Sequence, residues 1–292
     1  MTSRVPSIDV EAIGYNYQGE GPALQDVSFS VAPGDFVALM GPNGSGKTTL
    51  IKILLRLLTP QAGAVLLDGT DLRKLSPTQL YQHIGMVFQN PCDQLFAPTV
   101  EEDVAFGPKN LKLSRDEVQH RVDDALEAVD ATHLRHRPIH HLSFGEQRRV
   151  CLAGVLTMRP TVLLMDEPTA GLDPNCERHM VELLGRLNRE QGITIIMATH
   201  SVDLLPLLAR RALVLHRGRL LAHGSLREIF SDSDLIDRAG LRLPMVSQLF
   251  HDLDRHDSVA FGELPLTIGE GRRMLVERLL GADGKAAPKG GT

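Results

Sequence analysis

The chain has 292 residues, of which 42% are hydrophobic and 23% charged, as in an ordinary water-soluble globular protein. Its formal net charge of −5 argues against duplex DNA as the main partner, so we expect no nucleic acid to be bound. No run of 18 apolar residues occurs and the N-terminus has no apolar segment of the signal-peptide kind, so we expect neither a membrane-spanning helix nor a secretory leader.

Strands and one buried helix are predicted over the first quarter of the chain. Residues 27–31 alternate between apolar and polar, which is typical of a strand with one buried face. Residues 36–40 (FVALM) form a continuous apolar run, which indicates a strand buried on both faces of a parallel sheet. Residues 50–58 are apolar nearly all round and predict a buried helix that Pro60 ends. The pair Asp68-Gly69 between apolar runs predicts a hairpin.

Further along, helices alternate with buried strands. Residues 114–130 place apolar side chains on one face, and Ser114 with Glu117 predicts a capping box at the start of that helix. The other expected elements are buried strands at 161–165 and 193–200, a helix at 175–190 between them, and a hairpin at 211–224 that turns at Arg217-Gly218.

Another helix start is marked by LSFGEQRR, residues 142–149. Ser143 and Glu146 have the spacing of a capping box, so a helix is expected to begin at Ser143. Gly145 in the first turn and two arginines close behind it favour an anion at this helix start.

The strongest chemical motif is GPNGSGKTT, which fits the phosphate-loop pattern G-x-x-x-x-G-K-[ST] and lies between a buried strand and a helix. Glycines let backbone N–H groups close around phosphate oxygens. Lys47 would reach the β- and γ-phosphates, and the Thr48 hydroxyl would bind Mg²⁺. The predicted nucleotide-binding residues here are Gly41, Pro42, Asn43, Gly44, Ser45, Gly46, Lys47, Thr48 and Thr49.

Two acids end a buried strand in LLMDEP, residues 163–168. Parallel sheets bind their ligands at the carboxyl ends of the strands. Asp166 is therefore expected in the Mg²⁺ shell, and Glu167 is placed to polarise a water in line with the γ-phosphate. A pair of solvated loop acids is an equal alternative for this motif alone, but it loses weight beside a phosphate loop in the same chain.

Polar or aromatic residues near other strands complete the candidate site. Gln89 ends GMVFQ and is a candidate for the Mg²⁺ or water shell. His200 ends IIMATH and is a candidate for a hydrogen bond to the γ-phosphate, although a histidine at a strand end is more often structural. Tyr17 is a candidate for stacking on adenine, and the residues alone leave Tyr15 open as well.

Taken in order, these motifs resemble those of the ABC-type ATPase family, with LSFGE as the signature and AGLD (residues 170–173) as a further loop. The resemblance implies an α/β P-loop NTPase with a parallel core sheet, an N-terminal antiparallel β part, a helical subdomain and a small C-terminal extension. The implied boundaries are a nucleotide-binding domain at 5–230 with its helical subdomain at about 91–158, an extension at 231–280 that supports dimerisation, and a disordered tail at 281–292.

The resemblance also implies Mg²⁺-dependent hydrolysis of ATP to ADP and phosphate. Glu167 is then the general base or water-orienting group, and Lys47 and His200 stabilise charge on the γ-phosphate. Thr48, Gln89 and Asp166 serve Mg²⁺ and water.

In this family two nucleotide domains pack head to tail, and the signature helix of one covers the γ-phosphate held by the other. The chain has one phosphate loop and one signature, so Ser143 and Gly145 are expected to complete the site of a second subunit. The partner is either an identical chain or a similar ATPase. Phe144 and Glu146 depart from the commonest signature, Leu-Ser-Gly-Gly-Gln, and their role is open.

A finer resemblance, over residues 89–111, is to the ATPases of energy-coupling-factor importers, especially those for cobalt and nickel. It implies a transmembrane coupling subunit that docks near residues 89–106, a substrate-specific membrane subunit, and a peripheral position on the cytoplasmic face of the cell membrane. For Leu95, Phe96 and Phe106, filling of the core is the alternative to docking.

Other functions are weighed against this one. An energy-coupling ATPase for a vitamin fits as well, because the transported substrate never touches this subunit. A soluble ABC protein of DNA repair fits less well, since the chain lacks the long heptad run of the coiled-coil insertion that such proteins carry. A soluble ABC protein of translation fits less well too, since such proteins carry two phosphate loops and this chain has one. An unrelated P-loop kinase should lack the Ser143 signature.

Four histidines, His133, His136, His140 and His141, suggest a metal site in the loop before the signature. Pro138 breaks the helix that would align them, and no cysteine or carboxylate joins them in that stretch. A solvated loop is therefore the expected structure.

Overall fold

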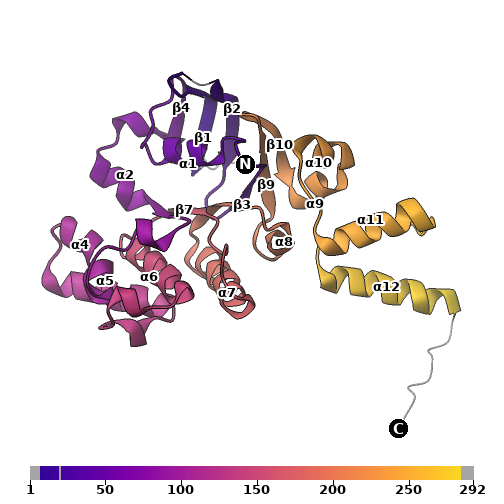
Figure 1. The fold of residues 1–292 in the computed structure, drawn as a ribbon. Coiled ribbons are helices and arrows are strands. Elements are labelled where there is room, and N and C mark those ends of the chain that lie inside the picture. The colour runs from indigo at the N-terminus through magenta and orange to yellow at the C-terminus, as the bar shows by residue number, and fades with distance from the viewer. Residues whose placement is uncertain (1–6, 20, 284–292) are drawn as a thin grey trace, which may run out of the picture.

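The computed structural model describes residues 7–19 and 21–283, and these form two β-sheets with helices around them (Figure 1). The first sheet is antiparallel, with the strand order β2-β1-β4-β5. Its strands are β1 (Ile8–Asn16), β2 (Pro22–Val31), β4 (Ala62–Leu67) and β5 (Thr70–Asp71).

The second sheet has the order β10-β9-β3-β8-β7-β6 and is parallel except for its edge pair β9 and β10. Its strands are β3 (Phe36–Met40), β6 (Ile84–Val87), β7 (Val162–Asp166), β8 (Thr194–Ala198), β9 (Arg211–His216) and β10 (Arg219–Ser225). The predicted α/β fold with a parallel core sheet and an N-terminal antiparallel part is confirmed.

The central strand β3 shows why a continuous apolar run predicts a buried strand. Its residues belong alternately to two core clusters, one on each face of the parallel sheet, and all are at most 4% exposed. Val37 and Leu39 pack with helix α1 (Lys47–Leu54) and the antiparallel sheet, whereas Ala38 packs towards the helices on the other face. Neither face meets water, so polar residues have no place in the run.

Helix α1 ends earlier than the sequence indicates. It stops at Leu54 in a Schellman motif, in which Arg56 has a φ of 55° and the Leu57 N–H donates to the Lys52 carbonyl at 2.8 Å. The Arg56 side chain also donates to the Leu72 carbonyl at 3.0 Å, which holds the turn against the next segment. The predicted buried helix is confirmed, but its predicted extent over 50–58 and its end at Pro60 are wrong for this reason.

Both predicted hairpins form. Asp68 and Gly69 have φ values of 47° and 78°, and Arg217 and Gly218 have φ values of 48° and 75°. Two successive positive φ values are the pattern of a type I′ turn, whose twist matches that of the flanking strands.

Helices cover the segment between β6 and β7, where the helical subdomain is predicted. The helices of this region, with α2 just before it, are α2 (Pro77–His83), α3 (Val100–Val104), α4 (Phe106–Asn110), α5 (Arg115–Ala128) and α6 (Phe144–Leu156). Ser114 caps α5 by accepting the Glu117 N–H at 3.2 Å, but the Glu117 carboxylate binds Arg121 at 2.7 Å. Only half of the capping box predicted at Ser114 is therefore present.

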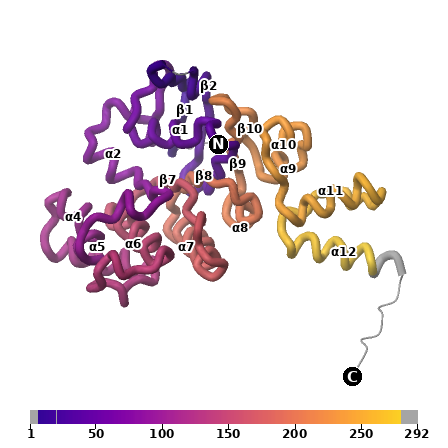
Figure 2. Tube along the Cα trace, in the orientation of Figure 1, coloured from indigo at the N-terminus to yellow at the C-terminus, as the bar shows by residue number. Residues whose placement is uncertain are grey.

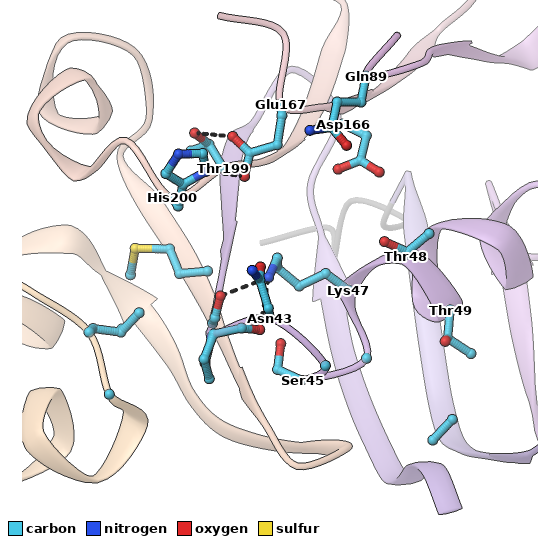
Figure 3. Close-up of a pocket in the computed structure, with 18 of the residues that line it drawn as sticks. Asn43, Ser45, Lys47, Thr48, Thr49, Gln89, Asp166, Glu167, Thr199 and His200 are labelled. Carbon is cyan, nitrogen blue, oxygen red and sulfur yellow. Dashed lines mark hydrogen bonds and ion pairs between the residues drawn. The ribbon is translucent and has the colours of Figure 1, made fainter. Parts of the chain in front are cut away.

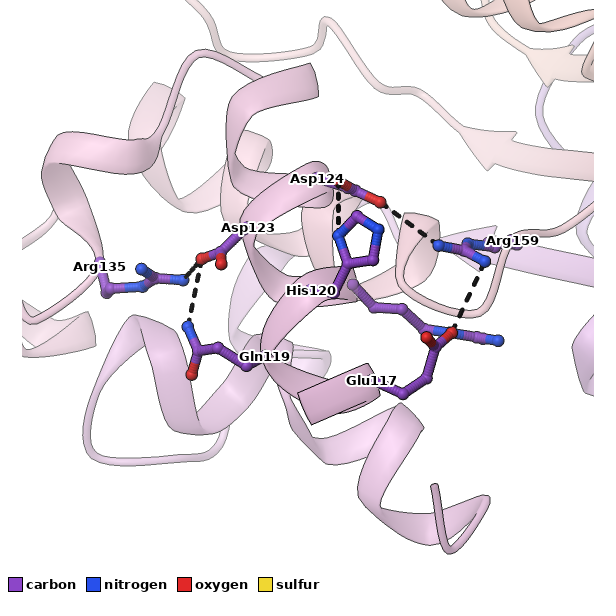
Figure 4. Close-up of polar contacts among 8 residues, drawn as sticks. Glu117, Gln119, His120, Asp123, Asp124, Arg135 and Arg159 are labelled. Carbon is purple, nitrogen blue, oxygen red and sulfur yellow. Dashed lines mark hydrogen bonds and ion pairs between the residues drawn. The ribbon is translucent and has the colours of Figure 1, made fainter. Parts of the chain in front are cut away.

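A polar network on α5 ties this helix to the segments on either side of α6 (Figure 4). Asp123 accepts hydrogen bonds from Arg135 and from Gln119, and Arg159 contacts both Asp124 and Glu117. These side chains are 20–53% exposed, so screening by water is expected to limit each pair to about 1 kcal/mol or less. The position of α5 therefore depends mainly on its buried face.

The remaining helices follow β7 in the chain. They are α7 (Pro174–Gln191), α8 (Leu205–Leu208), α9 (Leu226–Ser231), α10 (Ser233–Ala239), α11 (Met245–Asp257) and α12 (Ile268–Asp283). Within the described residues, no helix is both long enough and apolar enough to cross a bilayer.

Helices α11 and α12 form a pair that extends from the body beyond α9 and α10, on the side away from α4 and α5 (Figures 1 and 2). The two helices touch closely, because a Cβ on Gly271 of α12 would lie 2.7 Å from the Val246 side chain of α11. Residues 281–283 belong to α12, which contradicts the expected disorder there, and the rest of the predicted tail, 284–292, lies outside the described residues.

Candidate functional site

The loop between β3 and α1 has a backbone that only glycine allows at its ends. Gly41 has a φ of 146°, and a Cβ there would lie 2.2 Å from the Leu215 carbonyl oxygen and 2.7 Å from Ser45 Oγ. Gly46 caps α1 with a φ of 107°. The Ser45 hydroxyl is buried and has no hydrogen-bond partner among residues 7–19 and 21–283. A loop of this kind at a helix N-terminus, with an unpaired buried hydroxyl, fits a bound phosphate.

Replacing Gly41 by alanine is expected to lower the free energy of unfolding by about 2–5 kcal/mol, because the new Cβ overlaps backbone as well as straining φ. Gly44→Ala is the matched control. Gly44 also has a positive φ, 77°, but a Cβ there meets nothing within 4 Å, so only about 1–2 kcal/mol should be lost. Urea unfolding without nucleotide measures both, and equal losses would contradict the proposed overlap.

Lys47, the first residue of α1, turns back over this loop. Its Nζ donates to the carbonyl oxygens of Gly41 at 2.7 Å and Pro42 at 3.0 Å. Burial lowers the pKa of Lys47, and the nearby carboxylates of Glu167 and Asp166 act in the opposite direction. The ammonium group is thus held beside the phosphate cradle by contacts that an anion can replace.

Glu167 is oriented by two side chains from the end of β8 (Figure 3). Its Oε1 lies 2.7 Å from His200 Nδ1, and its Oε2 accepts a hydrogen bond from the Thr199 hydroxyl at 3.1 Å. Glu167 is 8% exposed and has a φ of 48°, and its N–H donates to the Ala198 carbonyl at 2.9 Å. Both the backbone and the carboxylate of Glu167 are therefore fixed from the neighbouring strand.

Asp166 precedes Glu167 at the end of β7. Burial raises the pKa of Asp166, and the adjacent Glu167 carboxylate raises it further, while Lys47 and Arg148 act against the shift. The folded protein therefore holds a carboxylate whose charged form is disfavoured.

This arrangement predicts that Asp166→Asn stabilises the metal-free and nucleotide-free protein at neutral pH. A carboxyl with a raised pKa binds its proton more tightly in the folded state than in the unfolded chain, so its contribution to stability falls as pH rises through the folded pKa. The variant's higher melting temperature should shrink towards that of the wild type as pH is lowered through the raised pKa. Thermal melts at several pH values test this, and an advantage that does not change with pH contradicts it.

These groups line one cavity of about 1240 Å³, with the strand-end residues on one side and the phosphate loop on the other (Figure 3). The predicted residues that line it are Tyr17, the whole loop from Gly41 to Thr49, Gln89, Asp166, Glu167 and His200. The Tyr17 hydroxyl lies 3.3 Å from the Thr49 hydroxyl. The rings of Tyr15 and Tyr17 pack edge to face, and Tyr15 does not line the cavity. Of the two tyrosines that the sequence leaves open, Tyr17 is the one that lines the cavity.

Some lining residues were not predicted. Thr199 lies directly before His200 in the sequence. A hydroxyl next to a histidine at a strand end is the sequence feature from which its place in the cavity could have been predicted. Leu241 and Arg242 reach the cavity from the loop after α10, in the C-terminal extension. No motif marks them in the sequence, and only the folded position of the extension brings them to the site.

The signature turn lies outside this cavity. Ser143 is exposed and forms the predicted capping box with Glu146. The Ser143 N–H donates to the Glu146 carboxylate at 2.7 Å, and the Glu146 N–H donates to the Ser143 hydroxyl at 3.4 Å. Neither Ser143 nor Gly145 lines the cavity. The expectation that both arginines behind them favour an anion is wrong for Arg148, which is buried and donates to backbone carbonyls.

The cavity fits Mg²⁺ as well as phosphate. The exposed Thr48 hydroxyl, the Gln89 amide and the Asp166 carboxylate all line it, and oxygen donors of these kinds are the ligands that Mg²⁺ prefers. Together with Lys47 and the oriented Glu167, they can bind a phosphate chain and hold a water against it.

The histidine-rich loop does not form an obvious cluster. His133 lies in one short 3₁₀ turn, and His140 and His141 lie in another. His136 is exposed and lies 3.4 Å from Glu101. In the part of the chain that the structure describes, no group of three or more His, Cys, Asp or Glu side chains is placed to hold a metal ion.

Comparisons with known proteins agree with the motifs. The profile described as ABC transporter matches residues 24–170. Curated transporter ATP-binding proteins match 92–94% of the chain at 41–52% identity. One of them, the energy-coupling factor transporter ATP-binding protein EcfA of Methanosphaera stadtmanae, is 44% identical over 275 residues, which are 93% of this chain and 99% of that protein.

Solved structures show the same likeness. The first, cbiO1 from Clostridium perfringens, is described as part of the ABC transporter complex cbiONQ; it has a TM-score of 0.74 and 40% identity and covers 84% of this chain and 99% of its own. The second, the ATP-binding cassette MJ0796, is a dimer in a post-hydrolysis state bound to ADP and Pi; it has a TM-score of 0.66 and 29% identity and covers 75% of this chain and 99% of its own.

Proposed function

Because the chain belongs to the ABC transporter family and is an ABC-type ATPase, we propose that it is the ATP-hydrolysing subunit of an energy-coupling-factor importer for cobalt or nickel ions. The observation that carries the proposal is the single cavity in which the phosphate loop faces Asp166, Glu167 and His200. The likeness to EcfA over 93% of the chain supports the energy-coupling-factor assignment.

In the proposed site each residue has one task. Tyr17 stacks on the base, and the loop from Gly41 to Thr49 binds the phosphates. Thr48, Gln89 and Asp166 would hold Mg²⁺, which neutralises phosphate charge when it is bound. Glu167 orients the attacking water and takes its proton.

Lys47 and His200 must both change partners for this chemistry. Lys47 is bound to two loop carbonyls and His200 to the Glu167 carboxylate. A γ-phosphate competes for the Lys47 ammonium and for the His200 side chain, so its binding would release Lys47 from the loop and draw His200 towards the phosphate. Loss of the γ-phosphate on hydrolysis reverses both exchanges, which gives the site two states.

The assembly we propose is a dimer, with an identical chain or with a similar ATPase. Ser143 and Gly145 lie at an exposed helix start away from their own cavity, as a site completed by a second subunit requires. The dimeric cassette MJ0796 supports this arrangement by similarity.

We also propose that a transmembrane coupling subunit docks beside Gln89, which places the chain peripherally on the cytoplasmic face of the cell membrane. Phe96 and Phe106 are 63% and 47% exposed, and their rings meet edge to face at 4.6 Å. Core filling therefore does not explain these two residues, whereas Leu95 packs against the core as that alternative expected. A substrate-specific membrane subunit would complete the complex.

The ion assignment rests on the resemblance of residues 89–111 to cobalt and nickel importers, and a vitamin is the second candidate. The test of this assignment is to purify the tagged chain from membranes and identify its partners. Uptake is then assayed with labelled nickel, cobalt and vitamins. Uptake of nickel or cobalt that depends on the chain is the expected result. Vitamin uptake overturns the ion, and a chain with no membrane partner overturns the transporter.

A further inference from the structure

Arg148 is buried inside the protein although it lies only five residues after the exposed Ser143. It is 1% exposed, and it is the only Lys or Arg among residues 7–19 and 21–279 that the structure places in the buried class. A guanidinium group loses much hydration on burial, and burial lowers the pKa of Arg148. A buried guanidinium needs acceptors for its N–H groups, and Nη1 and Nη2 of Arg148 find them, whereas its Nε has no hydrogen-bond partner among the residues that the structure describes.

The acceptors of Arg148 are three backbone carbonyls in the two segments that follow strands β6 and β7. Its Nη1 donates to the Glu167 carbonyl at 3.1 Å and to the Phe88 carbonyl at 3.4 Å, and its Nη2 donates to the Ala170 carbonyl at 3.1 Å. Phe88 directly precedes Gln89, and Ala170 begins the AGLD loop. One side chain therefore contacts the backbone of Glu167 and of the residue next to Gln89.

The other side of Arg148 faces the signature turn. Its Cζ lies 5.0 Å from the centre of the Phe144 ring, a cation–π distance, and Phe144 is the residue after Ser143. Both belong to α6, a continuous helix of 13 residues whose start is fixed by the Ser143–Glu146 capping box. A displacement of the turn is therefore passed along a rigid element to Arg148.

We infer that Arg148 is a positioning residue that joins the signature turn to the backbone of Glu167, so that closure of the turn over a partner's nucleotide aligns the water-activating carboxylate in the chain's own cavity. ATP hydrolysis at the two sites of the dimer is then coupled. Phe144, which replaces the commonest glycine of the signature, supplies the contact that fixes the guanidinium. This inference rests on the proposed dimeric ATPase.

The test compares ATP hydrolysis as a function of ATP concentration for the full chain and its variants. Arg148→Met is expected to lower kcat about ten- to a hundredfold through misplaced Glu167, with the KM for ATP within about twofold, since the phosphate loop is untouched. The Hill coefficient should fall to 1 from a higher wild-type value. Arg148→Lys keeps the positive charge but loses the two terminal nitrogens that reach separate carbonyls, so its kcat should lie between those of Arg148→Met and the wild type.

Arg121→Met is the matched control. Arg121 also lies in the helical region, its side chain is 16% exposed, and it donates to the Thr157 carbonyl at 3.2 Å; neither residue lines the cavity. It should lower the melting temperature and leave kcat and the Hill coefficient unchanged. If Arg148→Met does not fold, Phe144→Leu, which removes only the ring, should lower the Hill coefficient with a smaller loss of kcat.

The outcomes of this test distinguish failure of the inference from failure of the proposed function. A wild-type Hill coefficient of 1, variants whose kcat and Hill coefficient match those of the wild type, or a loss expressed only in KM, would overturn the positioning role and leave the ATPase standing. A wild-type chain that neither hydrolyses ATP nor dimerises with it refutes the proposed function itself.

Discussion

Replacing Glu167 by glutamine is expected to slow ATP hydrolysis by about 10²–10⁴-fold, the usual contribution of a positioned general base. Glutamine keeps the volume and the Thr199 hydrogen bond but cannot take a proton from water. The phosphate loop and Tyr17 are unchanged, so ATP still binds. Steady-state release of phosphate measures the loss.

The same variant should trap the dimer. ATP that is bound and not hydrolysed keeps the signature turn of each chain over the other's cavity, so light scattering is expected to show dimers with ATP and monomers without it. Glu182→Gln on α7 removes one negative charge from an exposed position and is the control. Normal turnover by Glu167→Gln, together with a monomer in the presence of ATP, would contradict the mechanism.

The parts of the fold and site that the sequence predicts are those with a local cause. The run at 36–40 is apolar throughout because both faces of the strand are covered, so the pattern alone identifies the central strand. The phosphate loop follows from the glycines it requires. Asp166 and Glu167 fall at the carboxyl end of a predicted strand, and parallel strands bring such ends together.

The parts that the sequence does not predict depend on contacts between distant segments. Arg148 looks like a surface cation at a helix start, and only the positions of three remote carbonyls make it a buried one. Arg242 reaches the cavity because the extension folds back after α10. The turn that ends helix α1 is held by the Arg56 side chain, which donates to carbonyls 16 and 19 residues away, and no local propensity encodes these contacts.

Placing a negative charge at Ser143 is expected to weaken ATP-driven dimerisation about a hundredfold or more. Aspartate caps a helix as well as serine does, so Ser143→Asp should leave α6 folded. Its carboxylate, however, would face the γ-phosphate of the partner's ATP, and a like-charge contact of this kind costs several kcal/mol. Ser143→Asn caps equally and carries no charge, so it should dimerise nearly as the wild type does. Equal behaviour of the two variants in sedimentation would show that this turn does not meet a phosphate.

Mixing two inactive chains decides whether Ser143 acts on its own cavity or on its partner's. Lys47→Met disables the phosphate loop and leaves the signature turn intact, whereas Ser143→Asp does the reverse. If the turn acts across the dimer, the mixed pair has one intact composite site, and an equal mixture should retain about a quarter of the ATP that wild-type dimers hold. Retention is measured by filter binding of labelled ATP in the Glu167→Gln background. If the turn instead serves its own cavity, every cavity in the mixture has either a disabled phosphate loop or a disabled signature turn. No labelled ATP is then expected to be retained on the filter. The first outcome is expected because neither Ser143 nor Gly145 lines the cavity of its own chain, which leaves this helix start free to meet the nucleotide of another.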